Sequence, residues 1–186
     1  RNEFIRQVKQ VASSATGNAM HMFESSRLMK DGYIHGGMYA MIAIFLYVLI
    51  SFNSLRTALI VLLPVVVGSV WTVGIMDLVD VSFNLANLVI LPLIIGIGVV
   101  NGVHIVHRYR EETDKTTSIL TRSTGSSVIL SSLTTMIGFG SLMVADHQGV
   151  FSLGLVLSLG VGSCLMASIT VLPAVLRLCT AQGWKV

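Results

Sequence analysis

The chain has 186 residues, of which 53% are hydrophobic and only 11% are charged. A soluble domain usually has about 25% charged residues, so this composition excludes a water-soluble fold and a largely disordered chain. The net charge of +3 does not indicate a nucleic-acid partner, because the basic residues flank apolar segments and do not cluster as a nucleic-acid groove requires.

Five apolar segments without a charged residue run through the chain. They are residues 33–52, 57–76, 83–107, 123–145 and 149–176. Each has at least 20 residues, about the length that a helix needs to cross ~30 Å of hydrocarbon. The strands of a transmembrane barrel would have ~10 residues of alternating polarity, so a barrel is excluded. The sequence therefore predicts an all-α polytopic membrane bundle of five transmembrane helices.

Residues 1–32 differ from these spans because they contain five basic and three acidic residues. Apolar residues recur at helical spacing between Phe4 and Val11, as at the amphipathic end of a soluble domain. We expect Asp31-Gly32 to break the chain before the first span. The predicted domains are residues 1–32, the end of an outer domain and its linker, residues 33–178, the five-helix transmembrane domain, and residues 179–186, a tail. The abrupt start is typical of a piece of a longer polypeptide.

The links between the spans carry opposite charges. The links after the first and third spans and the C-terminal tail contain Arg56, Arg108, Arg110, Lys115, Arg122, Arg177 and Lys185. The links after the second and fourth spans contain only Asp77, Asp80 and Asp146. Basic links stay in the cytoplasm, which predicts a cytoplasmic C-terminus and residues 1–32 outside. The five basic residues of 1–32 conflict only mildly with this topology, because long translocated domains escape the rule.

Polar side chains inside the spans carry the functional hypotheses. Asn101 and His104 are three residues apart in the third span and therefore share a helix face. The fourth span has a polar stripe at helical spacing, made of Ser127, Ser131, Thr134 and Gly138, with Thr135 beside it. The two faces together would form a polar seam. His104 is the only ionisable residue well inside a span, which indicates a proton or substrate path.

Each of these residues also has a structural interpretation. Small and hydroxyl residues at helical spacing more often pack helices together, and we favour packing for the fourth span. A neutral His104 hydrogen-bonded to a neighbouring helix is an equal alternative to a titrating one. We expect close helix approach at the glycines Gly96, Gly98, Gly102 and Gly138. His104 and His107 have the spacing of a metal pair, but no further ligand in the span completes a tetrahedral set.

Catalytic motifs are absent from the sequence. It contains no G-x-S-x-G, no H-E-x-x-H, no P-loop and no paired carboxylates inside a span. The two cysteines, Cys164 and Cys179, lie in or just after the last span, and we interpret them as unpaired packing residues. We therefore expect no catalytic residue, no cofactor and no metal.

Three segments resemble a known family. Residues 91–112, LPLIIGIGVVNGVHIVHRYREE, resemble the fourth helix of a repeat in the resistance–nodulation–division (RND) transporters. Their branch is similar to the MMPL-type lipid exporters, and within it to the hopanoid-biosynthesis-associated transporters. Residues 131–140, SSLTTMIGFG, resemble the next helix of that repeat, and residues 171–174, VLPA, resemble its last. Residues 83–87, FNLAN, also fit, and the likeness covers roughly residues 18–178.

The resemblance implies the second-half membrane repeat of a twelve-helix transporter, helices eight to twelve. Its partners would be the first-half repeat of the same polypeptide, a membrane lipid as substrate, and further copies in a homo-oligomer (dimer or trimer). Such proteins reside in the cell inner membrane and export lipids or other hydrophobic molecules toward the periplasm, driven by proton entry. The same unit resembles the sterol-sensing domain, so a non-transporting lipid-sensing or scaffold module is the alternative. An intramembrane enzyme is a distant third.

The sequence departs from the family pattern at one position. The pattern often reads Gly-x-Gly-Val-Asp, and the acidic position here is Val100, followed by Asn101. The resemblance then implies that acidic groups of the first-half repeat carry the proton. Asn101, His104 and Thr134, with Thr135 beside them, would supply hydrogen bonds to those groups, as at repeat interfaces in other transporters.

Overall fold

A computed structural model describes residues 18–82, 89–111 and 122–182, and within these ranges every regular element is helical. The elements are α2 (Asn18–Phe52), α3 (Leu55–Leu78), α4 (Ile90–Glu111), α5 (Arg122–Gly140), the short 3₁₀ helix η1 (Ser141–Val144) and α6 (Gln148–Ala181). The 83–87 motif, the 4–11 pattern, Lys115 and Lys185 lie outside the described residues.

The helices have the length that a membrane requires. Four segments are long and apolar enough to cross one, namely Arg27–Phe52, Leu55–Leu78, Gly125–Val144 and Gln148–Ala181. The 22 residues of α4 extend about 33 Å, and α4 lies among these helices. Pro64 and Pro173 lie within α3 and α6, which continue past them. The prediction of an all-α membrane helix bundle is confirmed.

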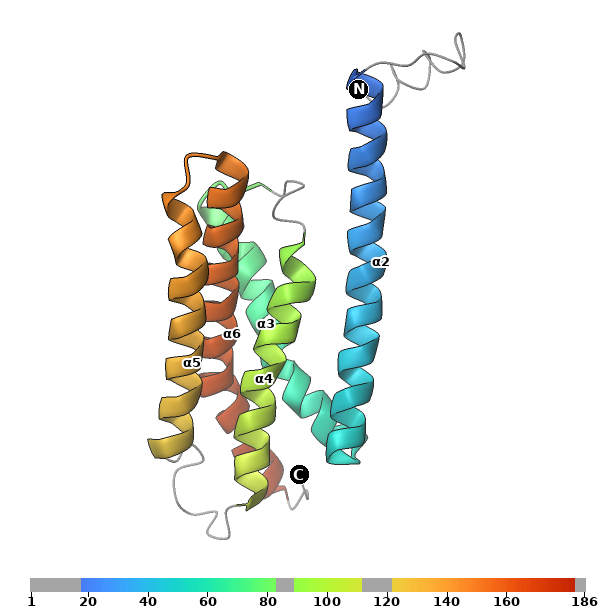
Figure 1. Cartoon of the computed structure of the whole chain (residues 1–186). Helices are drawn as coiled ribbons and strands as arrows, with labels where there is room; N and C mark the ends of the chain where they lie inside the picture. Colours follow the sequence, from blue (N-terminus) through green and yellow to red (C-terminus); the bar gives the residue numbers. More distant parts are fainter. Residues whose placement is uncertain (1–17, 83–88, 112–121, 183–186) are drawn as a thin grey trace.

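The centre of the bundle is α6. It contacts α3, α4 and α5, and Figure 1 shows α4, α5 and α6 side by side with α3 crossing them obliquely. Of the apolar window of α6, 61% of the residues are buried, against 6% for the window in α2. Many buried residues of α6 are small, including Gly154, Gly160 and Ser163. Lipid is as apolar as a leucine side chain, so close packing of small residues supplies much of the helix association.

Three glycines mark where the backbones come closest. A Cβ atom on Gly68 of α3 would lie 2.7 Å from Cys164 Cα on α6. On Gly102 of α4 it would lie 2.5 Å from the Val61 carbonyl oxygen of α3, and on Gly154 of α6 it would lie 2.7 Å from the Phe139 carbonyl oxygen of α5. No larger residue fits these crossings without moving a backbone, so the glycines set the spacing of the bundle.

The expected break at Asp31-Gly32 is wrong, because α2 runs unbroken through both residues. A glycine inside a helix costs about 1 kcal/mol relative to alanine. The backbone hydrogen bonds of the surrounding 35-residue helix outweigh that cost. The 35 residues of α2 extend about 52 Å, more than the ~30 Å of hydrocarbon. The division of the chain at residue 32 stays a prediction.

The charged residues gather at the two ends of the bundle. Arg56 lies in the first turn of α3, and Arg108 and Arg110 lie in the last turn of α4, whereas Asp77, Asp80 and Asp146 lie in or beside the links at the opposite end.

Arg110 connects the end of α4 to the turn between α2 and α3. Its guanidinium donates to the Phe52 carbonyl oxygen (3.2 Å) and to Thr57 Oγ1 (3.0 Å), and its central carbon lies 4.9 Å from the centre of the Phe52 ring. The turn between α2 and α3 is thereby fixed to the end of α4.

Candidate functional site

A hollow of about 470 Å³ lies between the C-terminal half of α4 and the first half of α5. Its lining residues are Val100, Asn101, His104, His107, Arg108, Glu111, Ser127, Val128 and Ser131. The α4 side supplies every charged or ionisable group, and the α5 side supplies hydroxyl and apolar groups. The ionisable groups of the hollow are therefore concentrated on one face of α4.

The deep end of the hollow is held by a hydrogen-bonded pair. Asn101 Nδ2 donates to Ser132 Oγ at 3.1 Å, and Ser132 Oγ lies 3.4 Å from Asn101 Oδ1, within donating distance. Both side chains are buried, with 4% and 2% of their surface exposed. A buried amide must find partners in an apolar environment, so this pair fixes the facing register of α4 and α5.

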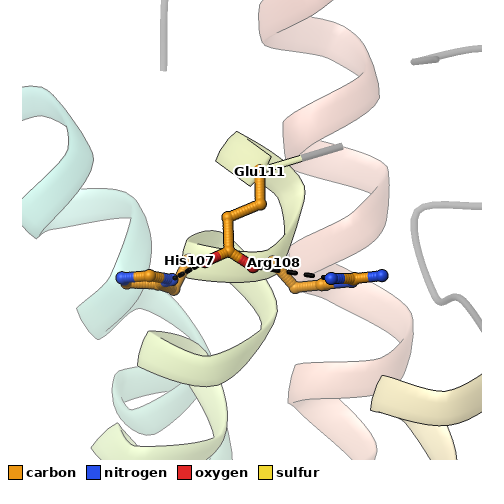
Figure 2. Close-up of polar contacts among 3 residues, drawn as sticks. All are labelled: His107, Arg108 and Glu111. Carbon is orange, nitrogen blue, oxygen red and sulfur yellow. Dashed lines mark hydrogen bonds and ion pairs between the residues drawn. The ribbon is translucent and has the colours of Figure 1, made fainter. Parts of the chain in front are cut away.

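His104 lies one turn beyond Asn101, and its exposed side chain lines the hollow. The residues expected to share a face with it do so, because Asn101, His104, Ser127 and Ser131 all border the same space. At the described end of α4, Glu111 bridges two neighbours. Figure 2 shows its carboxylate between His107 (Nδ1 to Oε1, 3.3 Å) and Arg108 (Nη1 to Oε2, 3.5 Å). These exposed ion pairs contribute at most about 1 kcal/mol to stability.

The hydroxyl groups of the two threonines of the predicted site donate hydrogen bonds to backbone carbonyls of their own helix. Thr134 Oγ1 donates to the Leu130 carbonyl oxygen (2.8 Å) and Thr135 Oγ1 to that of Ser131 (2.9 Å). Neither borders the hollow. The residue that sequence reasoning missed is Ser132, the partner of Asn101. Its row on the helix, Gly125, Val128 and Ser132, has the same spacing as the stripe that we singled out, so periodicity alone favours neither row.

The four glycines expected to pack helices divide into two pairs. A Cβ on Gly98 would lie 3.0 Å from Cys164 Sγ of α6 and 3.3 Å from Val65 Cγ2 of α3. At Gly102, the backbone of α3 leaves no room for a Cβ. A Cβ on Gly96 or Gly138 would meet nothing within 4 Å among the described residues. Among the described residues, close approach therefore occurs at Gly98 and Gly102, which α4 turns toward α3 and α6, while its polar face is turned toward α5.

The hollow offers hydrogen-bonding groups and imidazole rings. No three His, Cys, Asp or Glu side chains among the described residues converge as metal ligands would. Two imidazoles, one carboxylate, one guanidinium, one amide and two serine hydroxyls border the space. Imidazole changes its charge near neutral pH and can both donate and accept a proton.

Comparison with known proteins places the chain in a family. The model of the MMPL family matches residues 4–186. A membrane protein of Methanocaldococcus jannaschii is 32% identical over 168 residues, which are 87% of this chain and 43% of that protein. The hopanoid transporter HpnN of Rhodopseudomonas palustris is 31% identical over 94% of this chain, and HpnN of Burkholderia multivorans is 27% identical over 93%.

The chain spans less than half the length of these relatives, since it covers only 20% and 19% of the two hopanoid transporters. The similarity extends over nearly all of the chain, and the apolar helices agree with the name of the Methanocaldococcus jannaschii relative, a membrane protein. This multi-pass membrane chain therefore belongs to the MMPL family.

Proposed function

We propose that the chain forms the second-half membrane repeat of a proton-driven exporter of lipids or other hydrophobic molecules. Membership of the MMPL family and the hopanoid transporters among the relatives support a lipid substrate, of which a hopanoid-like lipid is the first to try. The small share of those transporters that the chain covers agrees with one repeat of a longer polypeptide. The protein is then a transporter and not an enzyme.

The observation that carries the proposal is the polar face of α4. His104 is exposed toward the hollow next to the buried Asn101, on a helix of membrane-spanning length. An ionisable side chain at membrane depth is costly unless it has a polar partner or water. The first-half repeat would supply that partner in the form of acidic side chains. Thr134 and Thr135 would contribute only after releasing the backbone carbonyls that their hydroxyls now hold.

Val100 marks where this repeat depends on the other. It stands where the family pattern often has aspartate, it is 48% exposed, and it lines the hollow. A carboxylate from the first-half repeat that approaches Val100 would come within reach of Asn101 and His104. The proton would then be carried by the first repeat and positioned by this one.

The orientation in the membrane follows from the charges. The end that holds Arg56, Arg108 and Arg110 would be cytoplasmic, and the end with Asp77, Asp80 and Asp146 periplasmic. Residues 1–32 would then be periplasmic and the tail from 179 cytoplasmic, in the cell inner membrane. Cysteines introduced at positions 114 and 146 should react with impermeant reagents from opposite sides, and reaction of both from outside would contradict this orientation.

The proposal is tested with the full-length protein that contains this chain. We expect purified protein in liposomes to transfer a polycyclic or isoprenoid lipid to acceptor vesicles when a proton gradient is imposed. An ionophore that collapses the gradient should stop the transfer. Specific lipid binding without any gradient-dependent transfer would favour the lipid-sensing module instead. Failure with every such lipid would contradict the hopanoid-like substrate.

A further inference from the structure

Polar side chains follow one another along α4 from the middle of the helix to its end. Asn101, His104, His107 and Glu111 are spaced by three, three and four residues, so they lie on one face, and all four border the hollow. The face is buried at its inner end and exposed toward the end of the helix. Asn101 is 4% exposed, whereas the side chains of His107 and Glu111 are 62% and 53% exposed. The face therefore leads from the interior of the bundle to the solvent.

The hollow gives this face room for water. Its volume of about 470 Å³ would hold on the order of ten water molecules, at about 30 Å³ each. The serines Ser127 and Ser131 on the opposite wall offer hydroxyl groups that can hydrogen-bond to such water. At the outer end, His107 Nδ1 lies 3.3 Å from Glu111 Oε1, so that a proton can pass between these two groups directly.

We propose that His107 and Glu111 form the solvent end of the proton path, which leads from His104 to the solvent beyond α4. This inference rests on the proposed function. A carboxylic acid of the first-half repeat gives its proton to a ring nitrogen of His104, and the O–H bond breaks as the N–H bond forms. Water in the hollow carries a proton from His104 to His107. His107 passes it to the Glu111 carboxylate, and Glu111 releases it to bulk water, which regenerates each group.

The neighbouring cations leave this path open. Arg110 is held away from the hollow by the Phe52 carbonyl and Thr57 Oγ1. Arg108 pairs with Oε2 of Glu111 and so leaves Oε1 facing His107. The α5 wall of the hollow contributes Ser127, Val128 and Ser131, none of which carries a charge. The Phe52 ring packs edge-on against His107, with 6.5 Å between the ring centroids. Among the residues that the structure describes, the ionisable groups that line the hollow are thus His104, His107, Arg108 and Glu111.

The test uses the full-length protein in liposomes, with a pH-sensitive dye to record the proton flux that accompanies lipid transfer. We compare the parent protein with His107→Asn and Glu111→Gln. Each variant keeps a hydrogen-bonding side chain but removes a proton acceptor. Removing a positioned acid–base group lowers a proton-transfer rate by about a hundredfold or more. Water can replace the lost group in part, so we expect about a tenfold loss of proton flux.

Rescue distinguishes a proton carrier from a structural ion pair. Added imidazole, a small mobile proton carrier, should restore most of the flux of His107→Asn and Glu111→Gln. Arg177→Gln is the matched control, because it removes an exposed basic side chain of α6 that does not line the hollow, and its flux should remain within about twofold of the parent. Gel filtration checks that all variants stay folded.

The possible failures can be told apart. If the parent shows no proton flux coupled to lipid transfer, the proposed function is wrong, and so is the proposed outlet, the solvent end of the proton path at His107 and Glu111. If the parent transports and both variants match it from about pH 5 to pH 8, the outlet is wrong while the transport proposal stands. Folded variants that are slow but do not respond to imidazole would show that the pair is structural, and would also overturn the inference.

Discussion

Small residues occur both where α3 crosses α6 and where α4 meets α5. The helices touch at the first of these contacts and leave a hollow at the second. At Gly68 the backbones of α3 and α6 come so close that a Cβ would lie 2.7 Å from Cys164 Cα. Between α4 and α5, serines and a valine instead border a hollow of about 470 Å³. A stripe of small residues therefore permits close approach without requiring it, and the opposing face decides the outcome. Glycine opposite cysteine closes the gap, whereas His104 opposite serine leaves room for polar groups.

The largest expected effect comes from a substitution at the tight crossing of α3 with α6. Gly68→Leu should destabilise the protein by about 3 kcal/mol, because the added side chain collides with the α6 backbone. A Cβ on Gly74 of the same helix would meet nothing within 4 Å, so Gly74→Leu should not destabilise the protein and should gain up to about 1 kcal/mol from the higher helix propensity of leucine. Unfolding of the detergent-solubilised protein in increasing denaturant measures both. Equal stability of the two variants would show that α3 and α6 do not cross at Gly68.

The next largest expected effect concerns the hollow between α4 and α5. His104→Ala should lower proton-driven lipid transfer about tenfold, equivalent to about 1.4 kcal/mol in the barrier, and shift its pH optimum. His104→Asn keeps a hydrogen-bond donor but cannot titrate, and should retain more activity than the alanine variant. Both proteins should remain inserted and folded, because the side chain is exposed in the hollow. If both transport like the parent from about pH 5 to pH 8, His104 serves packing only.

The smallest expected effect concerns the hydrogen bond between Asn101 and Ser132 at the deep end of the hollow. In a double-mutant cycle, Asn101→Ala and Ser132→Ala should show a coupling of about 1 kcal/mol, because their hydrogen bond is buried between two membrane helices. Thr134→Ala paired with Asn101→Ala is the control and should show no coupling, since Thr134 bonds to its own helix. Equal coupling of Asn101 with Ser132 and Thr134 would place the register of α5 elsewhere.

The sequence predicts the spans well because their signal is long. The uncharged segment 57–76 becomes α3 (Leu55–Leu78), and 149–176 becomes α6 (Gln148–Ala181). A run of some twenty apolar residues has few alternatives to a membrane helix. The break at Asp31-Gly32 is wrong for the opposite reason, because a two-residue turn signal is outweighed by the hydrogen bonds of the surrounding helix.

The site is predictable only as far as one helix reaches. The shared face of Asn101 and His104 follows from helical spacing, and both residues line the hollow. Which row of α5 faces them cannot follow from spacing, since Ser131 and Ser132 each belong to an equally regular row. Packing against α6 decides the rotation of α5. Phe139 and Gly154 fix it, and so does the hydrogen bond from Ser158 Oγ to the Met136 carbonyl oxygen (3.3 Å).

The length of α2 has a mechanical consequence. Its C-terminal end is secured by the guanidinium of Arg110, and Gly37 touches α4, where an added Cβ would lie 3.1 Å from Pro92 Cγ. Beyond Gly37, about 28 Å of α2 extends toward Asn18, past the top of the other helices (Figure 1). A difference of about 10° in the tilt of α2 about this contact would displace the Asn18 end by about 5 Å. The angle at which Gly37 meets Pro92 therefore sets where the outer end of α2 lies.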